Sequence, residues 1–172
     1  MIIKKEMENA INEQIGHEFA ASAQYIAIAV YFDDESLPEL ATFFYNQSEE
    51  ERVHAMKMVK FLLDTGAYPI IPPIPELRNS FDDPSDAVGY ALAQEITVTN
   101  QINAMVSLAR EVGDHPSDNF LQWFVDEQVE EVDSMSTLLQ TIKHAGSSLL
   151  LVEDYVRRAI AAAAAAEGAG GE

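Results

Sequence analysis

Apolar residues recur at helical spacing along four long stretches of this chain. The stretches run from about Lys4 to Phe32, Pro38 to Thr65, Pro84 to Gly113 and Pro116 to Gly146. A shorter amphipathic segment, from Leu149 to Ile160, predicts a short fifth helix. The pattern predicts an all-α fold whose folded domain covers residues 1–160. The Ala- and Gly-rich segment 161–172 has low complexity and is predicted to be a flexible tail.

The segments between the helices contain residues that favour helix ends. Ser36 is predicted to cap the second helix and Asp83 the third, because their side-chain oxygens can accept hydrogen bonds from the amides of the first turn. Gly66 is predicted to end the second helix, since glycine tolerates the left-handed conformation that is common just after a helix.

One connection is long enough to cross the whole bundle. Residues 66–83 form a proline-rich linker of 18 residues, which could cover about 55 Å at roughly 3.1 Å per residue. A helix of about 28 residues is only roughly 42 Å long. Short turns join the first helix to the second and the third to the fourth, so each pair should be an antiparallel hairpin. The predicted architecture is a four-helix bundle with one long crossover between the second and third helices.

Each predicted buried face is apolar except at its middle. The polar residues at these middle positions are Glu18, Glu51, His54, Glu95, Gln128 and Glu131. A buried carboxylate without a partner costs several kcal/mol, so it must be protonated, paired with a cation or bound to metal. The chain has 10 Lys and Arg residues in total, and none falls at the middle of these faces. A metal site is therefore the favoured interpretation.

The spacing of these six residues repeats along the chain. An offset of 77 positions relates residues 18 and 95, 51 and 128, and 54 and 131. Within each copy, a glutamate precedes a pair of polar residues at i and i+3 by 33 positions. Two such hairpins packed face to face would enclose a site with two halves, which is the ligand plan of di-iron four-helix bundles.

Composition narrows the chemistry further. The chain has no cysteine, so any metal must be held by carboxylate, imidazole or amide groups, which suit iron, manganese or zinc. A net charge of −19 favours cations and argues against nucleic acid, although solubility alone would also explain such acidity. No apolar run is long enough to span a membrane. The charged N-terminus lacks the apolar region of a secretory signal, so the cytoplasm is the expected location.

Several local motifs carry a family resemblance. They are Asn12-Glu13-Gln14 leading to Glu18, Glu49-Glu50-Glu51-Arg52-Val53-His54, Glu95, Phe120-Leu121-Gln122-Trp123-Phe124 and Glu127-Gln128-Val129-Glu130-Glu131. These motifs resemble non-haem bacterial ferritins, and stretches such as Ala27 to Phe32 and Glu95 to Thr99 resemble the actinobacterial branch in particular. The resemblance covers roughly residues 1–160. It implies a ferritin-like fold and a hollow homo-oligomeric shell of twenty-four subunits. It also implies oxidation of Fe(II) by dioxygen or hydrogen peroxide at a ferroxidase centre in each subunit, and storage of ferric mineral inside the shell.

The resemblance assigns ligands to two irons in each subunit. The first iron would be held by Glu18, Glu51 and His54. The second would be held by Glu51, Glu95 and Glu131, with Gln128 close by and Glu51 bridging the two ions. An amide at position 128 in place of a carboxylate would make the second site less anionic, which leads to the hypothesis that its iron exchanges.

Other assignments by resemblance have simpler alternatives. Tyr25 would donate an electron or a hydrogen bond at the centre, or serve only as a core aromatic residue. A third iron site would be formed by Glu50, Glu127 and Glu130, which could instead be a solvated acidic face. The start of the fourth helix, with Asp114, His115 and Asp118, would line an iron-entry channel, or else consist of surface turn residues.

Haem is not expected, because this chain departs from haem-containing bacterioferritins at two positions. Arg52 stands where they have the haem-ligating methionine, and Glu130 where they have a histidine ligand. Three other classes of protein remain as alternatives. Di-iron oxygenases and ribonucleotide reductase subunits share the ligands, but they are normally much longer and need a substrate pocket. Rubrerythrin-type peroxidases usually add a four-cysteine iron site, which this chain without cysteine cannot form. An inert helical bundle would leave the 77-residue repeat unexplained.

Overall fold

The computed structural model describes the backbone of residues 2–169 and the side chains of residues 2–165. Its helices are α1 (Lys5–Asp34), α2 (Pro38–Asp64), α3 (Pro84–Glu111), α4 (His115–Ala145) and α5 (Leu149–Ala169). The all-α prediction is confirmed, and the predicted limits of the first four helices hold to within two residues. None of the helices described is both long and apolar enough to cross a membrane.

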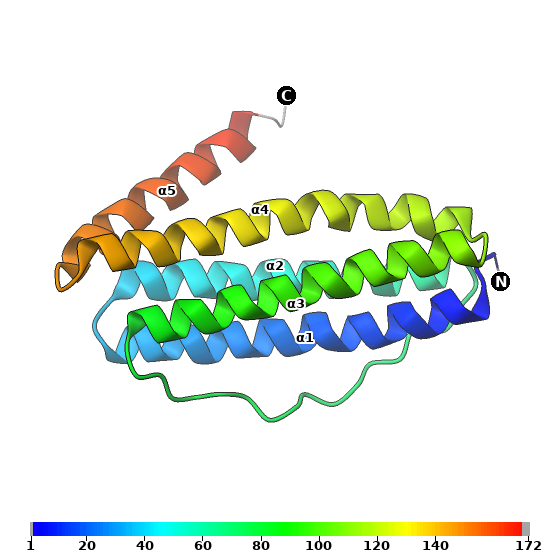
Figure 1. Ribbon diagram of the computed structural model, residues 1–172, viewed down its shortest axis with the longest axis horizontal. Coiled ribbons are helices and arrows are strands. Elements are labelled where there is room, and N and C mark those ends of the chain that lie inside the picture. The colour runs from blue at the N-terminus through cyan, green and yellow to red at the C-terminus, as the bar shows by residue number, and fades with distance from the viewer. Residues whose placement is uncertain (1, 170–172) are drawn as a thin grey trace.

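The first four helices lie side by side as a bundle, and α5 diverges from α4 at an acute angle (Figure 1). The segment between α2 and α3 runs along the outside of α1 from one end of the bundle to the other (Figure 1). This is the predicted long crossover, and it starts α3 at the end of the bundle opposite to where α2 ends (Figure 1).

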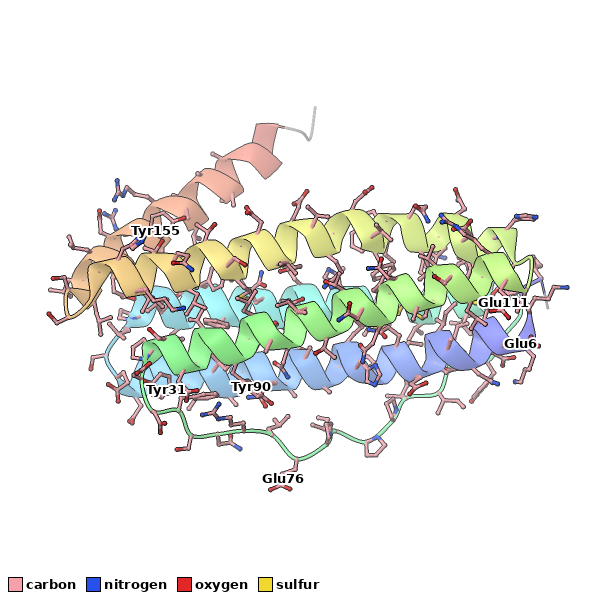
Figure 2. All side chains as sticks on the ribbon, in the orientation of Figure 1. Glu6, Tyr31, Glu76, Tyr90, Glu111 and Tyr155 are labelled. Carbon is pink, nitrogen blue, oxygen red and sulfur yellow. The ribbon has the colours of Figure 1, made fainter. Side chains whose placement is uncertain are left out.

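Hydrogen bonds from two side chains of α1 hold the crossover in place. Asn12 binds the backbone of Tyr68 and Ile70 (3.1 and 2.6 Å), and Gln24 both donates to and accepts from the backbone of Arg78 (2.7 and 2.9 Å). Between these points Pro72 packs on Gly16, where a Cβ would lie only 2.9 Å from the proline ring. Farther along the linker, Glu76 points away from the bundle (Figure 2).

The two predicted caps have different outcomes. Asp83 caps α3 as predicted, since its side chain accepts a hydrogen bond of 2.8 Å from the amide of Asp86. Ser36 does not cap α2, so that prediction is wrong: the N-cap is Leu37, and no side chain caps this helix. Ser36 instead has a φ of 59°, which the short turn needs to reverse the chain. Gly66 ends α2 as predicted, with a φ of 77°.

The fifth helix is longer than predicted. It continues through the alanine run to Ala169 instead of ending at Ile160, because alanine has the highest helix propensity and no breaker occurs before Gly168. Its first turns are anchored by Glu153, whose carboxylate accepts hydrogen bonds of 2.9 Å from the amides of Glu39 and Leu40 at the start of α2. Of the predicted flexible tail, residues 170–172 lie outside the described part of the chain.

The apolar core is divided into two clusters, one at each end of the bundle. The α5-side cluster includes Phe32, Leu40, Phe44, Val88 and Ile142, together with Val152 and Val156 of α5. The opposite cluster includes Ile11, Ile15, Leu62, Ile102 and Phe124. Between the two clusters the buried positions of all four bundle helices are mainly polar.

Candidate metal centre

The six polar residues predicted for the middle of the bundle are all buried there. Helix α1 supplies Glu18, α2 supplies Glu51 and His54, α3 supplies Glu95, and α4 supplies Gln128 and Glu131. Each is at most 4% exposed. Helical spacing explains this burial, because each residue lies on the same heptad stripe as the apolar residues of the two clusters.

One half of the centre brings three predicted ligands together. The possible ligand atoms of Glu18, Glu51 and His54 all lie within 4.8 Å of one another. The Nδ1 atom of His54 is 3.3 Å from a carboxylate oxygen of Glu51 and 3.9 Å from one of Glu18. Two carboxylates and an imidazole on rigid helices form a donor set that suits a divalent transition metal.

In the other half, Glu95 is held by two polar side chains. The amide nitrogen of Gln128 donates to the Glu95 carboxylate (3.1 Å) and also lies 3.2 Å from the backbone oxygen of Glu95 and from the hydroxyl of Thr99. The hydroxyl of Tyr25 donates to the other carboxylate oxygen of Glu95. Gln128 therefore orients Glu95 here.

Glu131 groups with a different set of neighbours from the predicted one. Its ligand atom lies within 4.8 Å of those of His54 and Glu127, whereas it was predicted to join Glu51 and Glu95 around one iron. His54 thus belongs to both clusters of possible ligands.

Burial of these acids makes their charged forms unfavourable. Burial raises the pKa of Glu18 well above its ordinary value, and the charge of Glu51 raises it further. The pKa of Glu51 is likewise raised, mainly by burial, and burial followed by the charge of Glu95 raises the pKa of Glu131 to about 9. Within the described side chains, no lysine or arginine forms an ion pair with any of these carboxylates. Their charge is thus left for protons or metal ions to neutralise.

Tyr25 lies directly beside the centre. Its ring is fully buried against Phe44, with 5.7 Å between the ring centroids, and its hydroxyl binds Glu95. Burial, followed by the charge of Glu95, raises the pKa of Tyr25 well above its ordinary value. The residue therefore stays a neutral hydrogen-bond donor, which fits both interpretations given from the sequence.

The residues predicted for a third iron site lie at the edge of the centre. Glu50 and Glu130 are exposed, and Glu127 is partly buried. Glu50 accepts a hydrogen bond from the buried amide of Gln47. Only Glu127 joins a cluster of possible ligands within the part of the chain that is described. Glu130 instead lines a groove of about 350 Å³ beside α5, together with Asp133 and Tyr155.

Sequence reasoning missed residues that support the centre. The buried Gln14 donates a hydrogen bond of 2.8 Å to Glu18, and His17 lies 3.4 Å from the Gln14 side-chain oxygen. The position of Gln14 four residues before Glu18, on the same helix face, was a usable signal. Asp114 is 2% exposed and accepts hydrogen bonds from the amides of Lys4 and Ser117 (2.6 and 3.1 Å), so its interpretation as a surface turn residue is wrong.

An antiparallel four-helix bundle with one long crossover and buried carboxylates at its middle is the architecture of ferritin-like proteins. The family model described as "Ferritin-like domain" matches residues 8–145, and the chain belongs to that family. It is 52% identical to ferritin BfrB of Mycolicibacterium smegmatis over 155 residues, which cover 90% of this chain and 86% of the relative. It is also 34% identical to the bacterial non-heme ferritin of Staphylococcus saprophyticus, over 84% of this chain and 87% of that protein.

The solved structures agree with these relatives. An open-pore ferritin from the archaeon Archaeoglobus fulgidus superimposes with a TM-score of 0.88 at 31% identity, covering 90% of this chain and 96% of the other. The resemblance to non-haem bacterial ferritins and the four-helix fold are therefore confirmed. Family and relatives together support iron storage as the general function of the chain.

Proposed function

We propose that this chain oxidises Fe(II) in the middle of its bundle and stores the Fe(III) product inside a protein shell. The observation that carries the proposal is the buried set of four glutamates, one histidine and one glutamine, which has no lysine or arginine partner among the described side chains. Iron is here the substrate and the stored cargo. Membership of the ferritin-like family supports this function over that of an inert helical bundle.

The first Fe(II) is held by Glu18, Glu51 and His54, whose ligand atoms already lie within 4.8 Å of one another. The second is held by Glu51, Glu95 and Glu131, with Gln128 beside it. Side-chain rotation is required here, because Glu131 lies nearer to His54 and Glu127 in the present arrangement. Metal binding displaces protons from these acids, since a carboxylate must be ionised in order to ligate.

The reaction removes one electron from each of two Fe(II) ions. With dioxygen, two electrons and two protons produce hydrogen peroxide, and with hydrogen peroxide the same input produces two water molecules. The hard carboxylate oxygens stabilise Fe(III) more than Fe(II), which favours oxidation. Tyr25, through its hydrogen bond to Glu95, holds that ligand in place and could also donate an electron to the centre.

After oxidation, Fe(III) must leave the centre for the store. The amide of Gln128 makes the second half of the site less anionic than a fourth carboxylate would, which favours release of the iron there. Glu50, Glu127 and Glu130, which are more exposed than the centre, would form the third iron site that the resemblance implies once their side chains rotate toward one another. The shell itself, of twenty-four subunits as in the resembling ferritins, would enclose the ferric mineral.

Aerobic addition of Fe(II) to the metal-free protein tests the proposal. We expect rapid ferric absorbance for about two irons per chain, and a very large particle when the same sample is examined by size-exclusion chromatography. Glu51→Ala and His54→Ala should abolish the rapid phase, whereas Glu76→Ala, on the exposed linker, should retain it. Oxidation no faster than in buffer would refute the ferroxidase function, and a monomer or dimer in solution would refute the shell.

A further inference from the structure

The imidazole of His54 faces a carboxylate with each of its two nitrogens. Nδ1 makes a hydrogen bond of 3.3 Å with Glu51 and lies 3.9 Å from Glu18, the partners proposed for the first iron. Nε2, on the opposite edge of the ring, lies 3.8 Å from a carboxylate oxygen of Glu127 on α4. The ring is only 3% exposed, so water has little access to either nitrogen.

Helix α4 also fixes the plane of this ring. Trp123 and Phe124 both meet it edge-on, at centroid distances of 5.5 and 6.0 Å with interplanar angles of 74° and 77°. Trp123 is held in turn by the ammonium group of Lys57, 3.7 Å from its ring centroid. Glu127 follows Trp123 by four residues, and thus by about one helical turn, on the same face of α4.

A histidine can bind a metal only through a nitrogen that carries no proton. In the neutral ring one nitrogen is protonated, and the hydrogen bond made by that nitrogen decides which one it is. For Nδ1 to face iron between Glu18 and Glu51, the proton must be on Nε2 and needs an acceptor. Among the described side chains, the carboxylate that forms an ion-pair contact with Nε2 is that of Glu127.

We infer that Glu127 is a positioning residue for His54: its carboxylate accepts a hydrogen bond from the protonated Nε2 and thereby leaves Nδ1 free to bind the first metal ion. At 3.8 Å the two atoms are beyond hydrogen-bond distance. The Glu127 side chain is 30% exposed and has room to close the gap by a small rotation. The inference rests on the proposed function for the metal-binding role of Nδ1, and it differs from the third-site role, in which Glu127 is itself an iron ligand.

Three variants separate the two roles of this residue. Glu127→Ala removes both the acceptor and the third-site carboxylate. Glu127→Gln removes the negative charge but keeps a side-chain oxygen that can accept from Nε2. Asp126→Ala is the matched control, because it removes an exposed carboxylate from the same turn of α4, at a residue with no described contact to His54.

Two measurements on these proteins test the inference. The first is the ¹⁵N NMR spectrum of metal-free protein labelled at its four histidines, with His54→Gln used to assign the His54 signals. The second is an anaerobic titration with Co²⁺, followed by its visible absorption. We expect the native protein, Glu127→Gln and Asp126→Ala to hold the proton on Nε2, with Nδ1 accepting its hydrogen bond from the acid form of Glu51, and to bind the first Co²⁺ alike. In Glu127→Ala the proton should be shared between both nitrogens, and the first Co²⁺ should bind about 10- to 100-fold more weakly.

The outcomes separate this inference from the proposed function. If Glu127→Ala keeps the native tautomer and the native affinity for the first Co²⁺, the inference is wrong while the metal centre stands. If the tautomer of His54 changes in Glu127→Ala as expected, but neither the native protein nor any variant binds Co²⁺, the contact between Glu127 and His54 is real and the proposed iron function fails. If circular dichroism shows that Glu127→Ala has lost helix content, Glu127→Leu replaces it, because leucine fills the space without offering an acceptor. Glu127→Leu must then show the same change of tautomer and the same loss of Co²⁺ affinity. A native tautomer in Glu127→Leu would overturn the inference.

Discussion

The two ends of the bundle and its middle are formed by the same four helices, yet they use burial for opposite purposes. At the ends, side chains such as Phe32 and Ile102 are removed from water and stabilise the fold. In the middle, Glu18, Glu51 and Glu131 are removed from water to a similar extent, and their burial opposes ionisation. The ends therefore supply the stability with which the protein holds an acidic centre ready for metal ions.

The largest expected effect on stability comes from emptying one of the apolar ends. Phe44 is fully buried and stacks on Phe32, with 5.5 Å between their ring centroids. Phe44→Ala should lower the free energy of unfolding by about 3–5 kcal/mol, because it removes apolar burial and leaves a cavity. Chemical unfolding of the metal-free protein measures this change. Phe44→Leu should cost clearly less, and equal costs for the two variants would argue against tight packing at this end.

The middle should show the reverse behaviour, with stability that depends on pH. Folded metal-free protein keeps Glu131 protonated up to a pKa of about 9, whereas the unfolded chain loses that proton near 4.5. Between these values unfolding releases a proton, so stability should fall as pH rises, by on the order of 3 kcal/mol from pH 4.5 to 7. Glu131→Gln cannot ionise and should be more stable than the native protein at pH 7.

Thermal unfolding of the metal-free proteins at several pH values checks this expectation. The native melting temperature should drop between pH 5 and 8, and the Glu131→Gln curve should be flatter. Glu76→Gln removes the same charge from the exposed linker and should keep the native slope. Identical slopes for native protein and Glu131→Gln would show that burial of this acid does not oppose folding.

A smaller effect is expected from polar groups at the bundle ends, which stabilise the fold because they are fully paired. Asp114 caps α4 and also accepts from the amide of Lys4, so it links the start of α1 to the start of α4. Asp114→Ala should cost about 1–2 kcal/mol, since it leaves two amides without their partner. Asp83→Ala loses one exposed capping bond and should cost less in the same unfolding assay. If Asp114→Ala is neutral, the linkage does not stabilise the fold.

Much of this arrangement could be predicted because it depends on periodicity along single helices. Heptad spacing placed Glu18 between Ile11 and Tyr25, and the structure buries all three. The linker length predicted the crossover. The cap at Asp83 was predictable since a capping side chain bonds only to its own first turn.

Features that depend on contacts between helices could not be predicted from the periodicity of single helices. Nothing local indicates that Glu153 of α5 accepts hydrogen bonds from the start of α2. The failed cap at Ser36 has the same origin, because closing a short turn between two packed helices needs a positive φ there. The grouping of His54 with Glu127 and Glu131 likewise depends on how α4 is rotated against α2.

The central claim, that the acidic middle of the bundle is a paired iron site, is tested most directly by electron paramagnetic resonance. Metal-free protein would be loaded anaerobically with two Fe(II) per chain, exposed to dioxygen and frozen within the rapid phase. Two Fe(III) ions bridged by Glu51 should couple magnetically and give little signal, and Glu51→Ala should not form this silent pair. A strong signal of isolated Fe(III) from the native protein, equal to that of Glu51→Ala, would contradict the account.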